Sequence, residues 1–104
     1  MMSATTTRRN TMITAIVLID TDPARIPEIA AEVAAIQGVS EVYSVTGEVD
    51  LVAMVRVREH EKLADVIADR LSKVDGVLRT QTYIAFRAYS DHDLEEAFDL
   101  GLGD

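Results

Sequence analysis

The chain has 104 residues, the length of one small domain with a single hydrophobic core. Its net charge of −8, from 18 acidic and 10 basic residues, disfavours direct binding to nucleic acid or to an anionic membrane surface. It contains no cysteine, which excludes disulfides and thiolate metal sites and fits the cytoplasm, the location that we expect. No apolar run approaches the roughly 18 residues that a membrane-spanning helix needs.

The N-terminal half predicts a tail, a strand and a helix in that order. Residues 1–11 are polar and carry no apolar signal-peptide core, so we expect a flexible tail. An apolar, β-branched run over residues 12–19 predicts the first strand. Asp22 and Pro23 are typical of a helix start, and Gly38 is placed where a helix ends, so a helix is predicted between them.

The first half closes with a strand, and the second half repeats the order strand, helix, strand. The two strands that flank the middle of the chain are predicted over residues 39–45, in the first half, and 51–57, in the second. An amphipathic helix is predicted over residues 60–74, with Gly76 at its end. A final strand is predicted over residues 77–89.

The two halves resemble each other in sequence. The segment Ile36–Val39 (IQGV) and the segment Val74–Val77 (VDGV) occur at the same place, a helix end followed by a strand start. The chain is therefore predicted to be β-α-β twice. Right-handed crossovers place the first and third strands in the centre of a four-stranded antiparallel sheet, with both helices on one face. The expected fold is α+β, ferredoxin-like βαββαβ, over residues 12–89.

Apolar residues occupy both faces of the predicted central strands. In the first strand Ala15 and Val17 alternate with Ile16 and Leu18, so neither face is polar. Two short helices can cover only one face, and the other would be a large exposed apolar patch. We therefore predict a homodimer that packs sheet against sheet, as in a dimeric α+β barrel.

Residues 90–104 are expected to form a short acidic helix and tail. Ser90 or Asp91 can cap a helix in which Leu94, Ala97 and Phe98 make one apolar stripe. A helix this short is marginal alone and must dock on its own domain or on a neighbouring subunit. The sequence leaves both options open.

The inventory of reactive side chains is small. His60 and His92 have no second ligand at metal-binding spacing, and no P-loop, nucleophile elbow or dinucleotide motif is present. Tyr43, Tyr83 and Tyr89 have no evident base beside them, so we expect them to serve in packing. No catalytic residue, metal site or cofactor is predicted.

The turn Val45–Asp50 (VTGEVD) joins the two halves and has two interpretations. In the structural one, Gly47 adopts a positive φ and Asp50 accepts a backbone N–H within the turn. In the functional one, backbone N–H groups around Gly47 bind a carboxylate while Asp50 accepts an ammonium. Those are the two charges of a free α-amino acid.

This turn and its surroundings resemble a known family. The T-G-x-x-D pattern of residues 46–50, with Gly38-Val39 before it and Gly76-Val77 and Thr80-Gln81-Thr82 after it, is similar to the C-terminal domain of Lrp/AsnC transcription regulators. That domain is called RAM, for regulation of amino-acid metabolism, and the resemblance covers residues 12–89. It implies a module that dimerises through its sheet, assembles into higher oligomers such as rings, and binds small effectors, typically amino acids, between dimers.

The resemblance also implies a set of ligand-binding residues. Backbone groups near Gly47 would contact the effector, Asp50 would accept its ammonium, and two threonines of the last strand would face them. The implied residues are Thr46, Gly47, Glu48, Val49, Asp50, Thr80 and Thr82. Only about eleven polar residues precede the first strand, so we expect a stand-alone RAM protein without a helix-turn-helix. It would sense an amino acid or modulate full-length Lrp/AsnC relatives by joining their assemblies.

Two other classes remain open from the sequence. An enzyme of the dimeric α+β barrel type, such as a monooxygenase or an isomerase, has the same topology and encloses a cavity between sheets. Such an enzyme needs polar side chains in that cavity, and this sheet offers few. A purely structural assembly partner would bind no small molecule, and amino acids would then leave its thermal stability and oligomer size unchanged.

Overall fold

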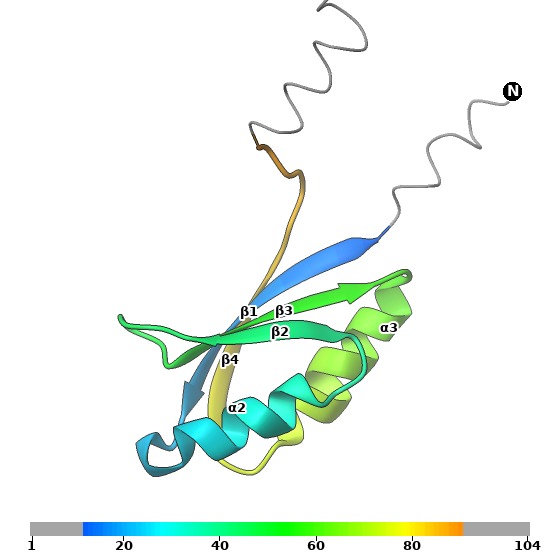
Figure 1. The fold of residues 1–104 in the computed structure, drawn as a ribbon. Helices are drawn as coiled ribbons and strands as arrows, with labels where there is room; N and C mark the ends of the chain where they lie inside the picture. The colour runs from blue at the N-terminus through cyan, green and yellow to red at the C-terminus, as the bar shows by residue number, and fades with distance from the viewer. Residues whose placement is uncertain (1–11, 91–104) are drawn as a thin grey trace, which may run out of the picture.

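The computed structural model describes residues 12–90, which form a four-stranded antiparallel sheet covered by helices on one face (Figure 1). The elements are β1 (Ile13–Thr21), a 3-10 turn η1 (Pro23–Arg25), α2 (Ile26–Ala34), β2 (Val39–Ser44), β3 (Leu51–Val57), α3 (His60–Ala64), a π-helical segment η2 (Asp65–Arg70), a 3-10 turn η3 (Leu71–Lys73) and β4 (Val77–Ile84). The strand order is β2-β3-β1-β4. The predicted α+β, ferredoxin-like βαββαβ fold is therefore confirmed.

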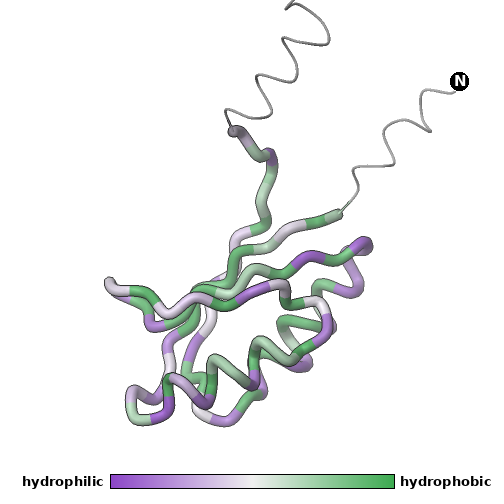
Figure 2. The backbone as a smooth tube through the Cα atoms, in the orientation of Figure 1, coloured by the Kyte–Doolittle hydropathy of each residue, from purple (hydrophilic) through white to green (hydrophobic). Residues whose placement is uncertain are grey.

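The core lies between the sheet and the helices. Residues of odd number on β1 and β3, from Ala15 to Ile19 and from Leu51 to Val57, are buried on the helix face. They pack against fully buried Ile29, Val33 and Leu71 of the helical layer. Hydrophobic residues accordingly run along the central strands in Figure 2. Burial of an aliphatic side chain of this size stabilises the fold by about 1.5–3 kcal/mol.

Each predicted helix is interrupted in the structure. The Asp22 side chain caps η1 by accepting a hydrogen bond from the Ala24 N–H (3.0 Å), as the sequence predicts. A second proline, Pro27, lacks an N–H and suits only a helix start, so α2 begins at Ile26 as a separate element. The predicted helix over residues 60–74 is α-helical, then π-helical, then 3-10. A pattern of apolar spacing does not distinguish these three helix types.

Two glycines allow the two halves of the chain to pack closely against each other. Gly38 and Gly76 have φ values of +103° and +99°, which favour glycine. A Cβ at Gly38 would lie 2.7 Å from the side chain of Val66, in the second half of the chain. A Cβ at Gly76 would lie 2.5 Å from the side chain of Ile29, in the first half. Each helix-to-strand junction therefore packs closely on the helix of the other half.

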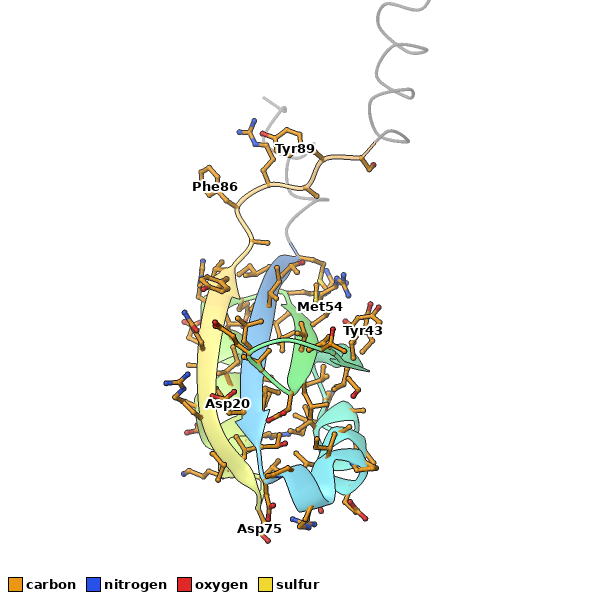
Figure 3. All side chains as sticks on the ribbon, turned by 90° about the vertical axis from the view of Figure 1, so that its left-hand side faces the viewer. Asp20, Tyr43, Met54, Asp75, Phe86 and Tyr89 are labelled. Carbon is orange, nitrogen blue, oxygen red and sulfur yellow. The ribbon has the colours of Figure 1, made fainter. Side chains whose placement is uncertain are left out.

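The last strand is shorter than predicted. β4 ends at Ile84 rather than at residue 89, and the last residue pair between β1 and β4 is Ala15 with Ile84. The final bond runs from the Ala85 N–H to the Thr14 carbonyl (2.8 Å). Phe86 is 96% exposed and lies beyond the end of the sheet in Figure 3.

Two sequence-based expectations lie outside the described residues, namely the tail over residues 1–11 and the helix within residues 90–104. In the part of the chain that is described, no helix is long and apolar enough to cross a membrane.

Candidate functional site

The turn between β2 and β3 is closed at its base and open at its tip. The Val45 N–H donates to the Asp50 carbonyl (3.2 Å), which joins the two ends of the turn. Gly47 has a φ of +129°, as predicted, and a Cβ added there would meet nothing within 4 Å. Thr46, Gly47 and Glu48 are all exposed. The tip is thus a stretch of accessible backbone.

No hydrogen bond within residues 12–90 involves the four residues from Thr46 to Val49. Four successive backbone N–H groups are therefore available to solvent or to a ligand. Backbone N–H groups around a glycine can together bind an anion such as a carboxylate. This is the donor set that the functional interpretation of the turn requires.

Asp50 fastens the turn to the end of β1. Its Oδ2 accepts hydrogen bonds from the backbone N–H of Thr21 (2.9 Å) and, more weakly, from the Thr21 hydroxyl (3.4 Å). Its own N–H donates to the Ile19 carbonyl (3.0 Å). The expectation that Asp50 accepts an N–H within its own turn is therefore wrong. The donor is 29 residues away in sequence, and Thr21 is only 3% exposed, so this bond satisfies a buried amide.

The structure does not bring Thr80 and Thr82 to the turn within one protomer. They pair with Ile19 and Val17 of β1, and β1 separates them from β3. Two strand spacings amount to roughly 10 Å. Both threonines lie on the helix face of β4, because their β1 partners belong to the core. Within a single chain they cannot contact the same small ligand as the turn tip.

One polar contact near this end of the sheet was not predicted from the sequence. The Arg79 guanidinium donates from Nε to Asp20 Oδ2 (3.1 Å), and the two residues are paired across β4 and β1. Asp20 precedes Thr21, the partner of Asp50, so two carboxylates lie close to the end of β1. Only the strand register reveals this arrangement, since the paired residues are 59 positions apart.

The sheet face opposite the helices, which we call the open face, is apolar at its centre. It comprises Thr14, Ile16, Leu18 and Asp20 of β1, Val52, Met54 and Arg56 of β3, Glu41 and Tyr43 of β2, and Arg79, Gln81 and Tyr83 of β4. Leu18 pairs with Val52 and Ile16 with Met54, which gives a contiguous apolar block. No helix of the described residues covers it in Figure 1, and Met54, Tyr43 and Asp20 are labelled on it in Figure 3.

The tyrosines of the open face are half exposed. Tyr43 and Tyr83 are each 51% exposed in the single chain, and their expected role in packing stays a prediction. The Tyr43 hydroxyl donates to Glu41 (3.1 Å), which also accepts from Arg56 (3.1 Å). The hydrogen bond to Glu41 and the negative charge of Glu41 raise the pKa of the Tyr43 phenol above its ordinary value of 10.

This cause can be tested by removing the charge of Glu41. In Glu41→Gln we expect the pKa of Tyr43 to fall toward 10, because the amide neither repels the phenolate nor accepts as strong a hydrogen bond. Spectrophotometric titration of tyrosine near 295 nm measures this change. An unchanged Tyr43 pKa in the variant would contradict the assignment.

Comparison with known proteins places the domain in a family. Residues 14–94 match the sequence pattern of the Lrp/AsnC ligand binding domain. The chain belongs to the Lrp/AsnC family. An HTH-type transcriptional regulator from Pyrococcus furiosus is 37% identical to this Lrp/AsnC domain over 76 residues, which are 70% of this chain and 51% of the relative. The HTH-type regulator LrpA from Pyrococcus horikoshii is 33% identical over 61 residues, 59% of this chain and 43% of LrpA.

Solved structures show the same Lrp/AsnC fold. The protein TTHA0845 from Thermus thermophilus is 46% identical, with a TM-score of 0.71 over 75% of this chain and 98% of that one. A feast or famine regulatory protein from M. tuberculosis, solved in complex with L-methionine, is 31% identical, with a TM-score of 0.65 over 83% and 58% of the two chains. The present chain spans about half the length, or less, of the curated regulators that it matches.

Proposed function

We propose that this Lrp/AsnC domain binds a free amino acid at the tip of the turn formed by residues 46–50. The observation that carries the proposal is the run of four unbonded backbone N–H groups, from Thr46 to Val49, beside the Asp50 carboxylate. The N–H groups would bind the carboxylate of the amino acid. The M. tuberculosis relative, solved with L-methionine, makes an amino acid the first ligand to test.

In this proposal Asp50 has two roles. Its Oδ2 holds the Thr21 N–H, while Oδ1 takes part in neither of the two bonds to Thr21 and would accept the ammonium of the ligand. A single turn cannot enclose an amino acid, so a neighbouring subunit must supply the second wall. Thr80 and Thr82, which are remote from the turn in their own chain, remain candidates for that wall.

We also propose that the domain is a homodimer through its open face and that such dimers form a higher oligomer. The apolar block of Ile16, Leu18, Val52 and Met54 supports this, because a soluble monomer rarely exposes a patch of this kind. The proposed role is regulatory, since the relatives that match this domain are HTH-type transcriptional regulators. Full-length relatives with the same domain are candidate partners in mixed assemblies.

Thermal unfolding in the presence of each amino acid tests the effector site. A ligand at 100 times its dissociation constant stabilises a protein by about 2.7 kcal/mol, which raises the melting temperature of a domain of this size by roughly 10 °C. We expect such a shift with one or a few amino acids, L-methionine first. No shift with any of the twenty would contradict the proposal and favour a structural role.

Two matched variants separate the roles of Asp50. Asp50→Asn keeps an oxygen that can accept from the Thr21 N–H but removes the charge that an ammonium requires, so we expect a folded protein with at least about tenfold weaker amino-acid binding. Asp69→Asn makes the same chemical change on an exposed residue of η2, outside the turn, and should bind normally. Equal affinities of the two variants would remove Asp50 from the site.

A further inference from the structure

A concavity of about 400 Å³ lies at the opposite end of β3 from the turn. Its wall includes Arg58, Lys62 and Arg70, from the end of β3 and from the helical segment that follows. Lys62 and Arg70 lie eight residues apart, with Val66 between them, as on one face of a helix. This site is separate from the proposed effector site.

These three cations have no ion-pair or hydrogen-bond partner within residues 12–90. A fourth cation of the concavity, Arg56, is paired with Glu41 at 3.1 Å. Asp65 is the carboxylate on the wall. The concavity therefore carries an excess of positive charge in a chain whose net charge is −8. An anionic partner is expected at such a place.

The chain itself contains a segment of complementary charge. Residues 91–104 hold six of its 18 acidic residues and no lysine or arginine. They also include Leu94, Phe98 and Leu100, whereas the concavity has apolar wall residues in Met12, Val57 and Val66. The segment and the concavity therefore carry opposite charges, and both contain apolar residues.

The described part of the chain that leads to this segment lies at the same end of the sheet as the concavity. Ala85 bonds to Thr14, so the chain leaves β4 beside the start of β1. A second hollow is lined by Met12 and Arg56 together with residues 85–88, and both Met12 and Arg56 also line the basic concavity. The 14 residues beyond Ser90 can span up to roughly 45 Å when extended, which is ample for this distance.

We propose that the acidic segment 91–104 docks in the concavity formed around Arg58, Lys62 and Arg70, either of its own subunit or of a neighbouring copy. The segment serves as a built-in anionic ligand that neutralises the basic site. An external acidic peptide or a small anion would have to displace it in order to bind there. This inference does not depend on the proposed amino-acid site.

Cleavage of the full chain by a glutamate-specific protease tests the docking, with mass spectrometry to follow cutting at Glu95 and Glu96. Exposed ion pairs are individually weak, so for three together we expect about tenfold slower cleavage of the docked segment. The triple variant R58E/K62E/R70E should lose this protection. Lys73→Glu reverses a charge on the neighbouring η3, outside the concavity, and should cleave like the unmodified protein.

One further variant and two further measurements distinguish the possible outcomes of this test. The neutral variant R58Q/K62Q/R70Q should also lose protection. It replaces the charge-reversal variant if thermal unfolding shows that the charge reversals unfold the domain. If protection persists at protein concentrations at which the oligomer dissociates, the segment docks within its own subunit. If protection is lost on dilution, the segment docks on a neighbouring copy. Equal cleavage rates for the unmodified protein and the folded triple variants would overturn the proposal. Inorganic phosphate that perturbs NMR signals of Arg58 and Lys62 without any protection of Glu95 would overturn it in favour of a free anion.

Discussion

Replacement of Gly76 by alanine is expected to destabilise the domain by about 2–5 kcal/mol. Two penalties combine, because φ is +99° at this residue and because the new Cβ would lie 2.5 Å from the Ile29 Cδ1 atom. Ile29 is fully buried, so its side chain can move only by disturbing the core. Urea unfolding followed by circular dichroism measures the loss as a lower transition midpoint with an unchanged slope.

Gly47→Ala is the matched control for this effect. Gly47 also has a positive φ, but no atom lies within 4 Å of the Cβ that alanine would add. Alanine at this position therefore lowers the stability only through its unfavourable positive φ, by about 1 kcal/mol. A loss at Gly76 no larger than the loss at Gly47 would show that Ile29 relaxes freely, and would contradict the close packing of the two halves.

Replacement of Leu18 by glutamate is expected to convert the proposed dimer into a monomer of 11.4 kDa. Leu18 lies at the centre of the open face, paired with Val52 on one side and Gln81 on the other. In a two-fold symmetric interface both subunits carry the substitution, so the interface loses two buried leucines and gains two carboxylates. We expect a dissociation constant at least about 1,000-fold higher, equivalent to about 4 kcal/mol. Sedimentation or light scattering gives the mass.

Leu78→Glu provides the control for this second prediction. It makes the same substitution at a residue that is already 68% exposed and does not belong to the open face. Its dimer should remain intact, and both variants should keep the circular dichroism of the folded domain. A native protein that is already monomeric at micromolar concentration, or a Leu18→Glu protein that stays dimeric, would eliminate the open face as the interface.

The sequence predicts this topology because its apolar periodicity and its glycines are local signals. Asp22 marks a helix start through its side chain, and Gly38 and Gly76 mark the helix ends through their positive φ values. The handedness of crossovers then leaves one arrangement of four strands. The break before α2 could also have been predicted, since Pro27 suits only the first turn of a helix.

Other features depend on contacts that no local pattern encodes. The partner of Asp50 is Thr21, and the partner of Arg79 is Asp20, both known only from the register of the strands. The end of β4 at Ile84 was not predicted, because Phe86 and Tyr89 are β-forming residues and the sequence alone does not show where the pairing with β1 stops. The candidate turn could be located from the sequence, whereas its attachment to β1 and its distance from Thr80 required the structure.

The reciprocal packing at Gly38 and Gly76 has a consequence for how chains can associate. Since the junction of each half rests on the helix of the other, neither half contains a complete core of its own. The only covalent link between them is the exposed turn from Thr46 to Glu48, which makes no core contact. Two copies that opened this turn and exchanged halves would rebuild every contact of both cores, so the architecture is compatible with domain swapping across this turn.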